Sequence, residues 1–139
     1  MQYTTAEALA KGYDILKMQS GMDPSWVATL PITDGMRILD VGCYKGRDLR
    51  WIFFNFPKCE LYGVDKQQVC IDHCQQTHAD TSIKWFCVDG SSLPFSDGFF
   101  DLVFSNGLDT DVSPEEWINI EKEMNRVGKK VVNGSQITN

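Results

Sequence analysis

The sequence predicts an α/β fold, in which helices cover a mostly parallel sheet. Two observations carry this prediction. From residue 36 onward, short apolar segments typical of buried strands alternate with longer segments of helical periodicity. The first four apolar segments also end in acidic, glycine or small polar residues. Because ligands bind beside the carboxyl ends of parallel strands, these residues predict a binding site along one edge of the sheet.

The expected elements follow from periodicity and from helix start signals. We expect strands at residues 36–41, 60–65, 82–89, 100–107 and 129–134, and helices at 46–56, 66–79 and 113–127. The last helix has a clear start, because Ser113 is a good cap, Pro114 suits the first turn and two glutamates follow. Two further helices are expected at 5–20 and 24–30. The chain is thus predicted to form a single domain, with N-terminal helices in 1–34 and an αβ core in 35–139.

Composition narrows the class of protein. The chain has 139 residues, of which 42% are hydrophobic, and this fits one core. We expect a cytoplasmic protein, since there is no long apolar run, no secretory signal, and an odd number of scattered cysteines. The net charge of −6 disfavours nucleic acid as a partner. The one basic cluster near the predicted site, residues 45–50, is expected to be the solvated start of a helix.

The segment RILDVGCYKGRD, residues 37–48, carries most of the functional information. Gly42 and Gly46 follow a predicted strand and lead into a helix, so they can adopt positive φ and let a ligand approach the backbone closely. Asp65 ends the next strand, where a carboxylate can accept hydrogen bonds from ribose hydroxyls. We call residues 42–46 the glycine loop. An acid about 20 residues beyond such a loop indicates a nucleoside site. These features alone fit either a dinucleotide or a nucleoside sulfonium ligand.

The motif details separate these two ligands. Reading from Gly42 gives G-C-Y-K-G, which does not meet the dinucleotide fingerprint G-x-G-x-x-G. The segment resembles instead the D-x-G-C-G-x-G motif of class I S-adenosylmethionine-dependent methyltransferases, with Tyr44 at the middle glycine. LYGVD, VDGSSLPFSDGFFDLVFSNG and EMNRV continue the resemblance over residues 36–134. It implies a Rossmann-like three-layer αβα sandwich. Family members usually add two more strands, so the sheet is expected to be shortened after its fifth strand.

The resemblance implies a site for S-adenosylmethionine, with S-adenosylhomocysteine as the product. Asp65 would hold the ribose, and Asp89 with the Gly90 amide would contact adenine. The glycine loop would line the methionine part, with Asp40 near its amino group. The positions implied to bind the cofactor are Asp40, Gly42, Cys43, Tyr44, Gly46, Asp65, Lys66, Asp89, Gly90, Ser105 and Asn106.

Two of these positions depart from the family pattern. Tyr44 either caps the methionine end and borders the acceptor, lies on the surface beside the loop, or crowds the cofactor. Lys66 stands where the family commonly has an apolar residue against adenine. Its charge would therefore lie near a cofactor that is itself cationic.

The resemblance implies a methyltransferase, and we expect it to act on a small-molecule acceptor mainly through proximity. Many relatives with such acceptors have histidines after the fourth strand, whereas this chain has Asp109 and Asp111. The catalytic candidates are Asp109, Asn106 and Tyr44, although the plainer interpretation of Asp109 and Asp111 is that they are loop residues before a helix cap. The alternative function is a catalytically inactive methyltransferase-fold protein with a binding or regulatory role. The edge strand at 129–134 offers a surface for a homodimer.

A histidine and cysteine cluster on the helix at 66–79 raises the question of a metal. Cys70, His73, Cys74 and His78 have spacings that bring side chains to one helical face. The alternative is that the two cysteines belong to a core stripe with the histidines at its edge, and we expect this arrangement and no metal. Cys87 is expected in the core, and Cys43 is expected to be partly accessible.

Overall fold

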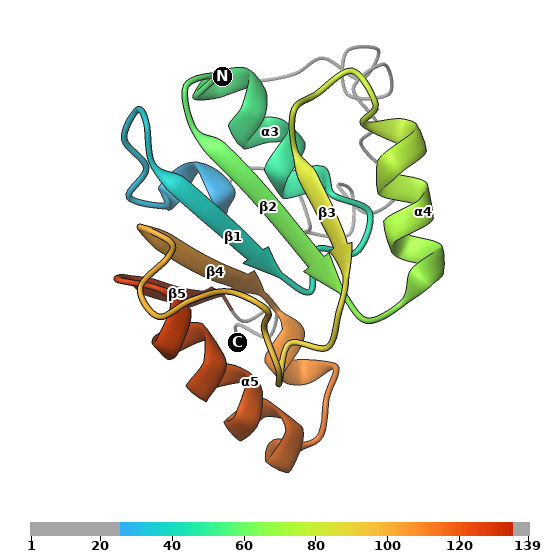
Figure 1. The fold of residues 1–139 in the computed structure, drawn as a ribbon, viewed down its shortest axis with the longest axis vertical. Helices are drawn as coiled ribbons and strands as arrows, with labels where there is room; N and C mark the ends of the chain where they lie inside the picture. The colour runs from blue at the N-terminus through green and yellow to red at the C-terminus, as the bar shows by residue number, and fades with distance from the viewer. Residues whose placement is uncertain (1–25, 135–139) are drawn as a thin grey trace.

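The protein is built on a five-stranded parallel sheet. The computed structural model describes residues 26–134. Within that range the strands are ordered β3-β2-β1-β4-β5, and every neighbouring pair is parallel (Figure 1). The chain builds outward from β1 to β3 and then returns to the other side of β1 for β4 and β5. The predicted α/β fold is therefore confirmed, and the order reverses between β1 and β4, where such sheets bind ligands.

The elements lie within the predicted ranges. The strands are β1 (Arg37–Val41), β2 (Glu60–Asp65), β3 (Lys84–Cys87), β4 (Leu102–Asn106) and β5 (Val131–Gly134). The helices are α3 (Arg47–Asn55), α4 (Gln68–Thr77) and α5 (Pro114–Val127), with 3-10 turns η1 (Val27–Thr29) and η2 (Leu108–Thr110). None of the described helices is long and apolar enough to cross a membrane. The helix expected at 5–20 and the start of the one at 24–30 lie outside the described residues.

Two apolar clusters hold helices against opposite faces of the sheet. Leu49 and Ile52 of α3 are fully buried on one face. Met124 and Val127 of α5 are fully buried on the other. Strand β1, between them, buries residues toward both faces, as its apolar sequence predicts. The result is the three-layer αβα arrangement.

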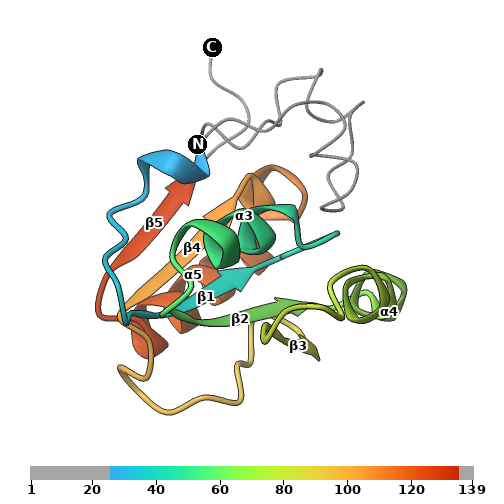
Figure 2. The same cartoon turned by 90° about the horizontal axis from the view of Figure 1, so that it is seen from above.

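The edges of the sheet differ from its centre. Figure 2 shows α4 beside β3 at one edge and β5 at the other. Because β3 is an edge strand, most of its residues stay exposed. Cys87 at its end is exposed, so the prediction that it belongs to the core is wrong.

The start of α3 is buried, which also corrects the sequence analysis. Arg47, Asp48 and Arg50 are only 8%, 7% and 4% exposed. Arg50 forms two hydrogen bonds of 2.8 Å with the carboxylate of Asp80, which follows α4. The basic cluster at 45–50 is therefore a packed junction between two helices and not a solvated helix start.

Helix α5 is fixed at both ends. Ser113 Oγ accepts a hydrogen bond of 3.1 Å from the Glu116 backbone N–H, which confirms the predicted cap. Near the other end, Arg126 donates to the carbonyls of Leu93 and Phe95 at 2.9 Å each. These bonds anchor the loop between β3 and β4, which carries Asp89, against the helix.

Candidate functional site

A cavity of about 280 Å³ opens at the carboxyl ends of the strands. Its size is close to the lower end of the range for ligand pockets, roughly 300–1,000 Å³. Seven of the residues implied to bind the cofactor line it: Gly42, Tyr44, Asp65, Lys66, Asp89, Gly90 and Asn106. Four others, Asp40, Cys43, Gly46 and Ser105, and the catalytic candidate Asp109 are not part of its wall. The predicted edge of the sheet thus carries the pocket.

The glycine loop is shaped by three residues with positive φ. Gly42, Tyr44 and Gly46 have φ of 77°, 51° and 78°. A Cβ on Gly42 would lie 3.0 Å from Leu108 Cδ2, and a Cβ on Gly46 would lie 2.6 Å from Trp85 Cη2. Both positions therefore need glycine for conformation and for space. Tyr44 adopts the backbone that a glycine would adopt there.

Asp65 connects the tip of β2 to the glycine loop. Its Oδ2 accepts a hydrogen bond of 3.0 Å from the Tyr44 backbone N–H. Its Oδ1 accepts one of 2.9 Å from the Gln67 backbone N–H. Each carboxylate oxygen can accept a second hydrogen bond, so the group retains capacity for two ligand hydroxyls.

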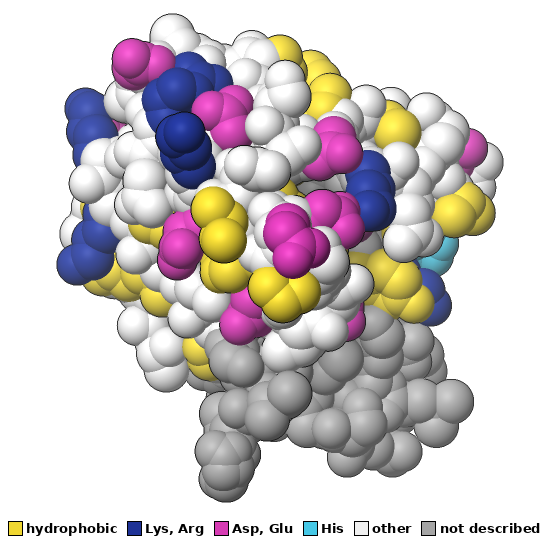
Figure 3. All heavy atoms as spheres, turned by 90° about the horizontal axis from the view of Figure 1, so that it is seen from below, with side chains coloured by type: hydrophobic (Ala, Val, Ile, Leu, Met, Phe, Trp, Pro, Cys, Tyr) yellow, Lys and Arg dark blue, Asp and Glu magenta, His cyan; other side chains and the backbone are white. Residues whose placement is uncertain are grey.

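The ring of charge around the pocket is mostly acidic. Asp65, Asp89, Asp111 and Glu116 line it, and Figure 3 shows acidic side chains gathered around a hollow on this face. Lys66 Nζ lies 3.1 Å from Glu116 Oε2, and this pair joins the tip of β2 to α5. The hydrogen bond to Glu116 raises the pKa of Lys66. The lysine charge is therefore compensated.

Asp89 is held by the turn that follows β3. Its Oδ1 accepts hydrogen bonds from the backbone N–H of Ser91 at 2.9 Å and from the Ser91 hydroxyl at 2.8 Å. These bonds lower the pKa of Asp89 and keep it ionised. Beside it, a Cβ on Gly90 would lie 3.0 Å from Val41 Cγ1. The pocket is therefore tight at this point.

Asp40 lies buried at the carboxyl end of β1. Burial, followed by the nearby carboxylates of Asp48 and Asp65, raises its pKa well above the ordinary value, and Arg47 opposes this shift. Asn106 Nδ2 donates to Asp48 Oδ2 at 3.0 Å, which links β4 to the start of α3. Acidic side chains are thus gathered beside the glycine loop, and the buried environment of Asp40 favours its protonated form.

The side chains of Cys43 and Ser105 are buried and do not line the pocket. Cys43 was expected to be partly accessible but is buried, because α4 packs over the loop. A hydrogen bond with Cys74 and burial raise the pKa of the Cys43 thiol, so it is a poor nucleophile. Ser105 is fully buried, and its hydroxyl has no hydrogen-bond partner among residues 26–134.

The cysteines of α4 are packing residues, and the two histidines differ in burial. Cys70 and Cys74 are buried as expected, and Cys74 packs against Cys43. His78 is fully buried, so the expectation that both histidines lie at the edge of the stripe is wrong for it. Among residues 26–134, no group of three or more histidine, cysteine or acidic side chains is placed to hold a metal ion.

Sequence reasoning missed the wall that α5 and η2 supply. Leu108, Val112 and Ile120 line the pocket from elements that follow β4. Their apolar side chains carry no chemical signal in the sequence. Ile120 lies beside the strand ends because α5 packs against the sheet, whereas Leu108 lies in η2, just after β4.

The order of the strands defines a doubly wound α/β domain, the class in which ligands bind where the strand order reverses. The chain belongs to the class I S-adenosylmethionine-dependent methyltransferase family: residues 38–130 match the family described as methyltransferase domain. The motif resemblance is therefore confirmed.

Individual relatives are distant. The chain is 28% identical over 133 residues to a malonyl-[acyl-carrier protein] O-methyltransferase of Hahella chejuensis. The aligned region covers 94% of this chain and 48% of that protein. A SAM-dependent methyltransferase of Methanosarcina mazei superimposes with a TM-score of 0.64 at 27% identity over 70% of this chain and 50% of that one. Phosphoethanolamine N-methyltransferase 1 of Haemonchus contortus was solved with phosphoethanolamine and S-adenosylhomocysteine. It superimposes with a TM-score of 0.71 at 19% identity, over 82% of this chain and 25% of that one. The chain spans about half the length of the Hahella relative.

Proposed function

We propose that this chain binds S-adenosylmethionine in the pocket and transfers its methyl group to a small-molecule acceptor. The observation that carries the proposal is the position of Asp65, at the pocket edge and hydrogen-bonded to the glycine loop. A ribose diol placed there can donate to both carboxylate oxygens, because each has accepted only one backbone N–H. Val41, Val64 and Ile120 supply apolar walls that suit adenine.

Charge supports the same ligand. The sulfonium and amino groups of the cofactor are cationic, and the pocket carries four carboxylates against one paired lysine. Asp89 has Oδ2 available for an adenine amine, since the Ser91 bonds use Oδ1. Asp40 would lie near the methionine end, where the cationic amino group would favour its ionised form. Residues of the loop that lie behind the wall, Cys43 and Gly46, would act through backbone geometry.

The bound cofactor supplies an electrophilic methyl group, and the protein supplies position and exclusion of water. Tyr44 and Asn106 line the pocket, so we propose that they border the acceptor. Asp109 does not line it, which makes it a weaker candidate. The Hahella relative is named as an O-methyltransferase of malonyl-[acyl-carrier protein], which suggests an oxygen acceptor. Small carboxylic acids and their thioesters are therefore the first acceptors to test, followed by amines that suit the acidic rim.

Calorimetry tests the cofactor site. We expect S-adenosylmethionine and S-adenosylhomocysteine to bind with micromolar affinity and NAD not to bind. Asp65→Ala should weaken S-adenosylhomocysteine binding by at least about tenfold, since it removes both ribose acceptors. Asp72→Ala is the matched control, because Asp72 is exposed on α4 and does not line the pocket. Failure of both S-adenosyl ligands to bind would rule the proposal out.

A transfer assay tests the enzyme. Radiolabelled S-adenosylmethionine is incubated with the wild-type chain and the acceptor panel, and a methylated product that Asp65→Ala does not form supports turnover. Cofactor binding without any transfer across the panel would favour the inactive binding or regulatory protein.

A further inference from the structure

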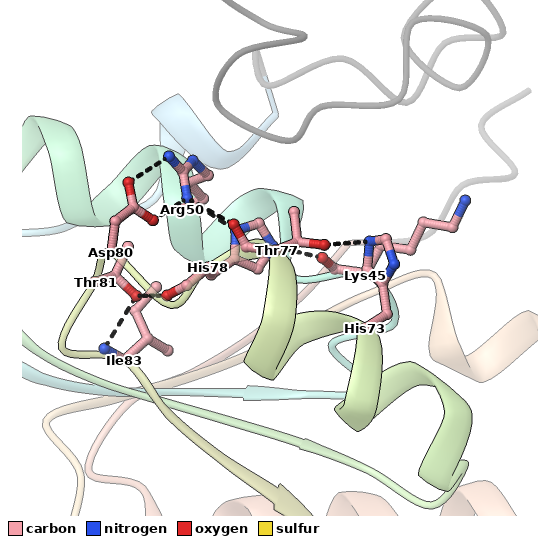
Figure 4. Close-up of polar contacts among 8 residues, drawn as sticks. All are labelled: Lys45, Arg50, His73, Thr77, His78, Asp80, Thr81 and Ile83. Atoms are coloured by element: carbon pink, nitrogen blue, oxygen red, sulfur yellow. Dashed lines mark hydrogen bonds and ion pairs between the residues drawn. The ribbon is translucent and has the colours of Figure 1, made fainter.

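His78 contacts the backbone of the glycine loop and does not line the pocket (Figure 4). It lies directly after α4, is 1% exposed, and places Nε2 2.8 Å from the carbonyl oxygen of Lys45. Lys45 immediately precedes Gly46, the residue that caps α3 in a left-handed conformation. A side chain outside the pocket thus holds the backbone at the turn of the loop.

The two partners of His78 fix its tautomer. A carbonyl oxygen only accepts, so Nε2 carries the hydrogen that is donated to Lys45. Nδ1 lies 3.1 Å from Arg50 Nη1, which only donates, so Nδ1 must be unprotonated. Arg50 is itself held by Asp80 at 2.8 Å. The geometry therefore requires a neutral imidazole in one orientation.

The imidazole also packs beside the ring of Trp85. Its ring lies 5.5 Å from that of Trp85, centroid to centroid. A Cβ on Gly46 would come within 2.6 Å of Trp85 Cη2 and 2.9 Å of His78 Cδ2. The two rings therefore form the floor under Gly46, and a shift of His78 must shift the loop.

We infer that His78 is a positioning residue for the cofactor loop, and that its protonation loosens the loop and weakens cofactor binding at acidic pH. The inference rests on the proposed function for its effect on the cofactor. A second proton on His78 would place an Nδ1–H against the Arg50 guanidinium, so the contact in Figure 4 would become repulsive.

The charged groups around His78 agree with this direction. Burial lowers its pKa, and the Arg50 guanidinium from α3 and His73 from α4 act in the same sense. The Lys45 carbonyl in the loop and Asp80 after α4 oppose them. The result is a pKa below the ordinary histidine value of 6.5, so His78 is neutral near pH 7.

The free protein provides the first test. Gly46 N–H is hydrogen-bonded to the Cys43 carbonyl at 2.8 Å, so its hydrogen exchange reports loop opening. In the wild-type chain, we expect the Gly46 protection factor to fall severalfold between pH 7.5 and 5.5, and further at lower pH, as His78 takes up a proton that ¹⁵N NMR detects. In His78→Gln it should stay constant, because glutamine can donate to Lys45 and accept from Arg50 without titrating.

Cofactor binding provides the second test. We expect the Kd for S-adenosylhomocysteine to rise severalfold over the same pH interval, and further at lower pH, in the wild type and in His73→Gln. His73→Gln is the matched control, because the chain has only two histidines and His73 contacts Thr77 and not the loop. His78→Gln should bind with wild-type affinity near neutral pH and lose the pH dependence. His78→Leu should bind about tenfold more weakly at all pH values.

The outcomes separate the two hypotheses. If Gly46 protection does not follow the titration of His78, the inference is overturned whatever the cofactor does. It is also overturned if the protein binds S-adenosylhomocysteine and His78→Gln keeps the wild-type pH dependence, or if His78→Leu is destabilised but binds normally when folded. If no S-adenosyl ligand binds while Gly46 protection does follow His78, the proposed function fails and the loop coupling stands.

Discussion

Tyr44 shows how a single residue can depart from a family motif and still keep its geometry. Its φ of 51° is positive, and it is the only residue other than glycine with such a value in residues 26–134. Positive φ costs a residue with a Cβ roughly 1–2 kcal/mol. The side chain is 41% exposed and lines the pocket, so it swings outward from the loop. Tyr44 therefore combines a strained backbone conformation with an aromatic ring that lines the pocket.

That strain is measurable by comparing two substitutions. Tyr44→Gly should be more stable than Tyr44→Ala by about 1 kcal/mol, because both remove the ring and only glycine relieves the left-handed backbone. Urea unfolding of the two variants measures the difference. The control pair is Lys45→Gly and Lys45→Ala, whose order should reverse, since Lys45 does not have positive φ. Equal stability of the two Tyr44 variants would contradict the backbone geometry of the loop.

Asp40 illustrates a conflict between stability and function at one position. Burial raises its pKa, so its ionisation opposes folding as pH rises above the ordinary aspartate value. Asp40→Asn should therefore increase the free energy of unfolding near pH 7 by about 1 kcal/mol, the usual size of a stabilising substitution. It should also weaken S-adenosylhomocysteine binding. Thermal unfolding and calorimetry on the same preparation measure both effects.

The exposed Asp34 provides the control for this substitution. Asp34→Asn should change neither quantity appreciably. If Asp40→Asn lowers stability instead, the carboxylate makes favourable native interactions that outweigh the cost of its burial.

Some residue environments follow from the sequence and others do not. Gly42, Asp65 and Asp89 come at strand ends, and the carboxyl ends of parallel strands share one edge, so their position beside the pocket could be predicted. The burial of Cys43, Arg50 and His78 depends on α4 packing against the start of α3. That contact joins segments about 30 residues apart, and no local pattern encodes it.

At the scale of elements, α5 contributes more to the site than its sequence indicates. Its amphipathic pattern and cap predict a helix with accuracy, because both signals are local. Its first turn also carries Glu116, which binds Lys66 across the pocket rim. The position of that turn over the strand ends depends on the route of the chain after β4, which periodicity does not specify.

The cap of α5 should therefore influence both stability and binding. Ser113→Ala removes the acceptor of the Glu116 N–H and should cost about 1 kcal/mol of unfolding free energy. Because Glu116 also holds Lys66, we expect a modest loss of S-adenosylhomocysteine affinity, about threefold or less. Ser92→Ala is the control, since Ser92 is an exposed serine in the neighbouring loop. A Ser113→Ala chain as stable as the wild type would show that the first turn of α5 is held by other contacts.

For the molecule as a whole, stability against pH combines groups with opposite signs. Asp80, Asp89 and Glu123 have lowered pKa values because of hydrogen bonds from Arg50, Ser91 and Arg126 respectively. The stability that they contribute is present above the ordinary carboxylate value and is lost as pH falls through their lowered values. Asp40 acts in the opposite direction, since its folded form binds a proton more tightly than its unfolded form.

His78 adds a separate step at higher pH. Its pKa is lowered by burial, so the unfolded chain takes up a proton near 6.5 while the folded chain does not until lower pH. The unfolding free energy of the wild type relative to His78→Gln should therefore fall as pH drops through 6.5 and level off below the folded pKa. This difference removes the contribution of the carboxylates to the pH dependence, that of Asp40 included, because they are common to both proteins. Urea unfolding at a series of pH values measures it, and a flat difference would mean that His78 is equally basic in both states and is not held between Lys45 and Arg50.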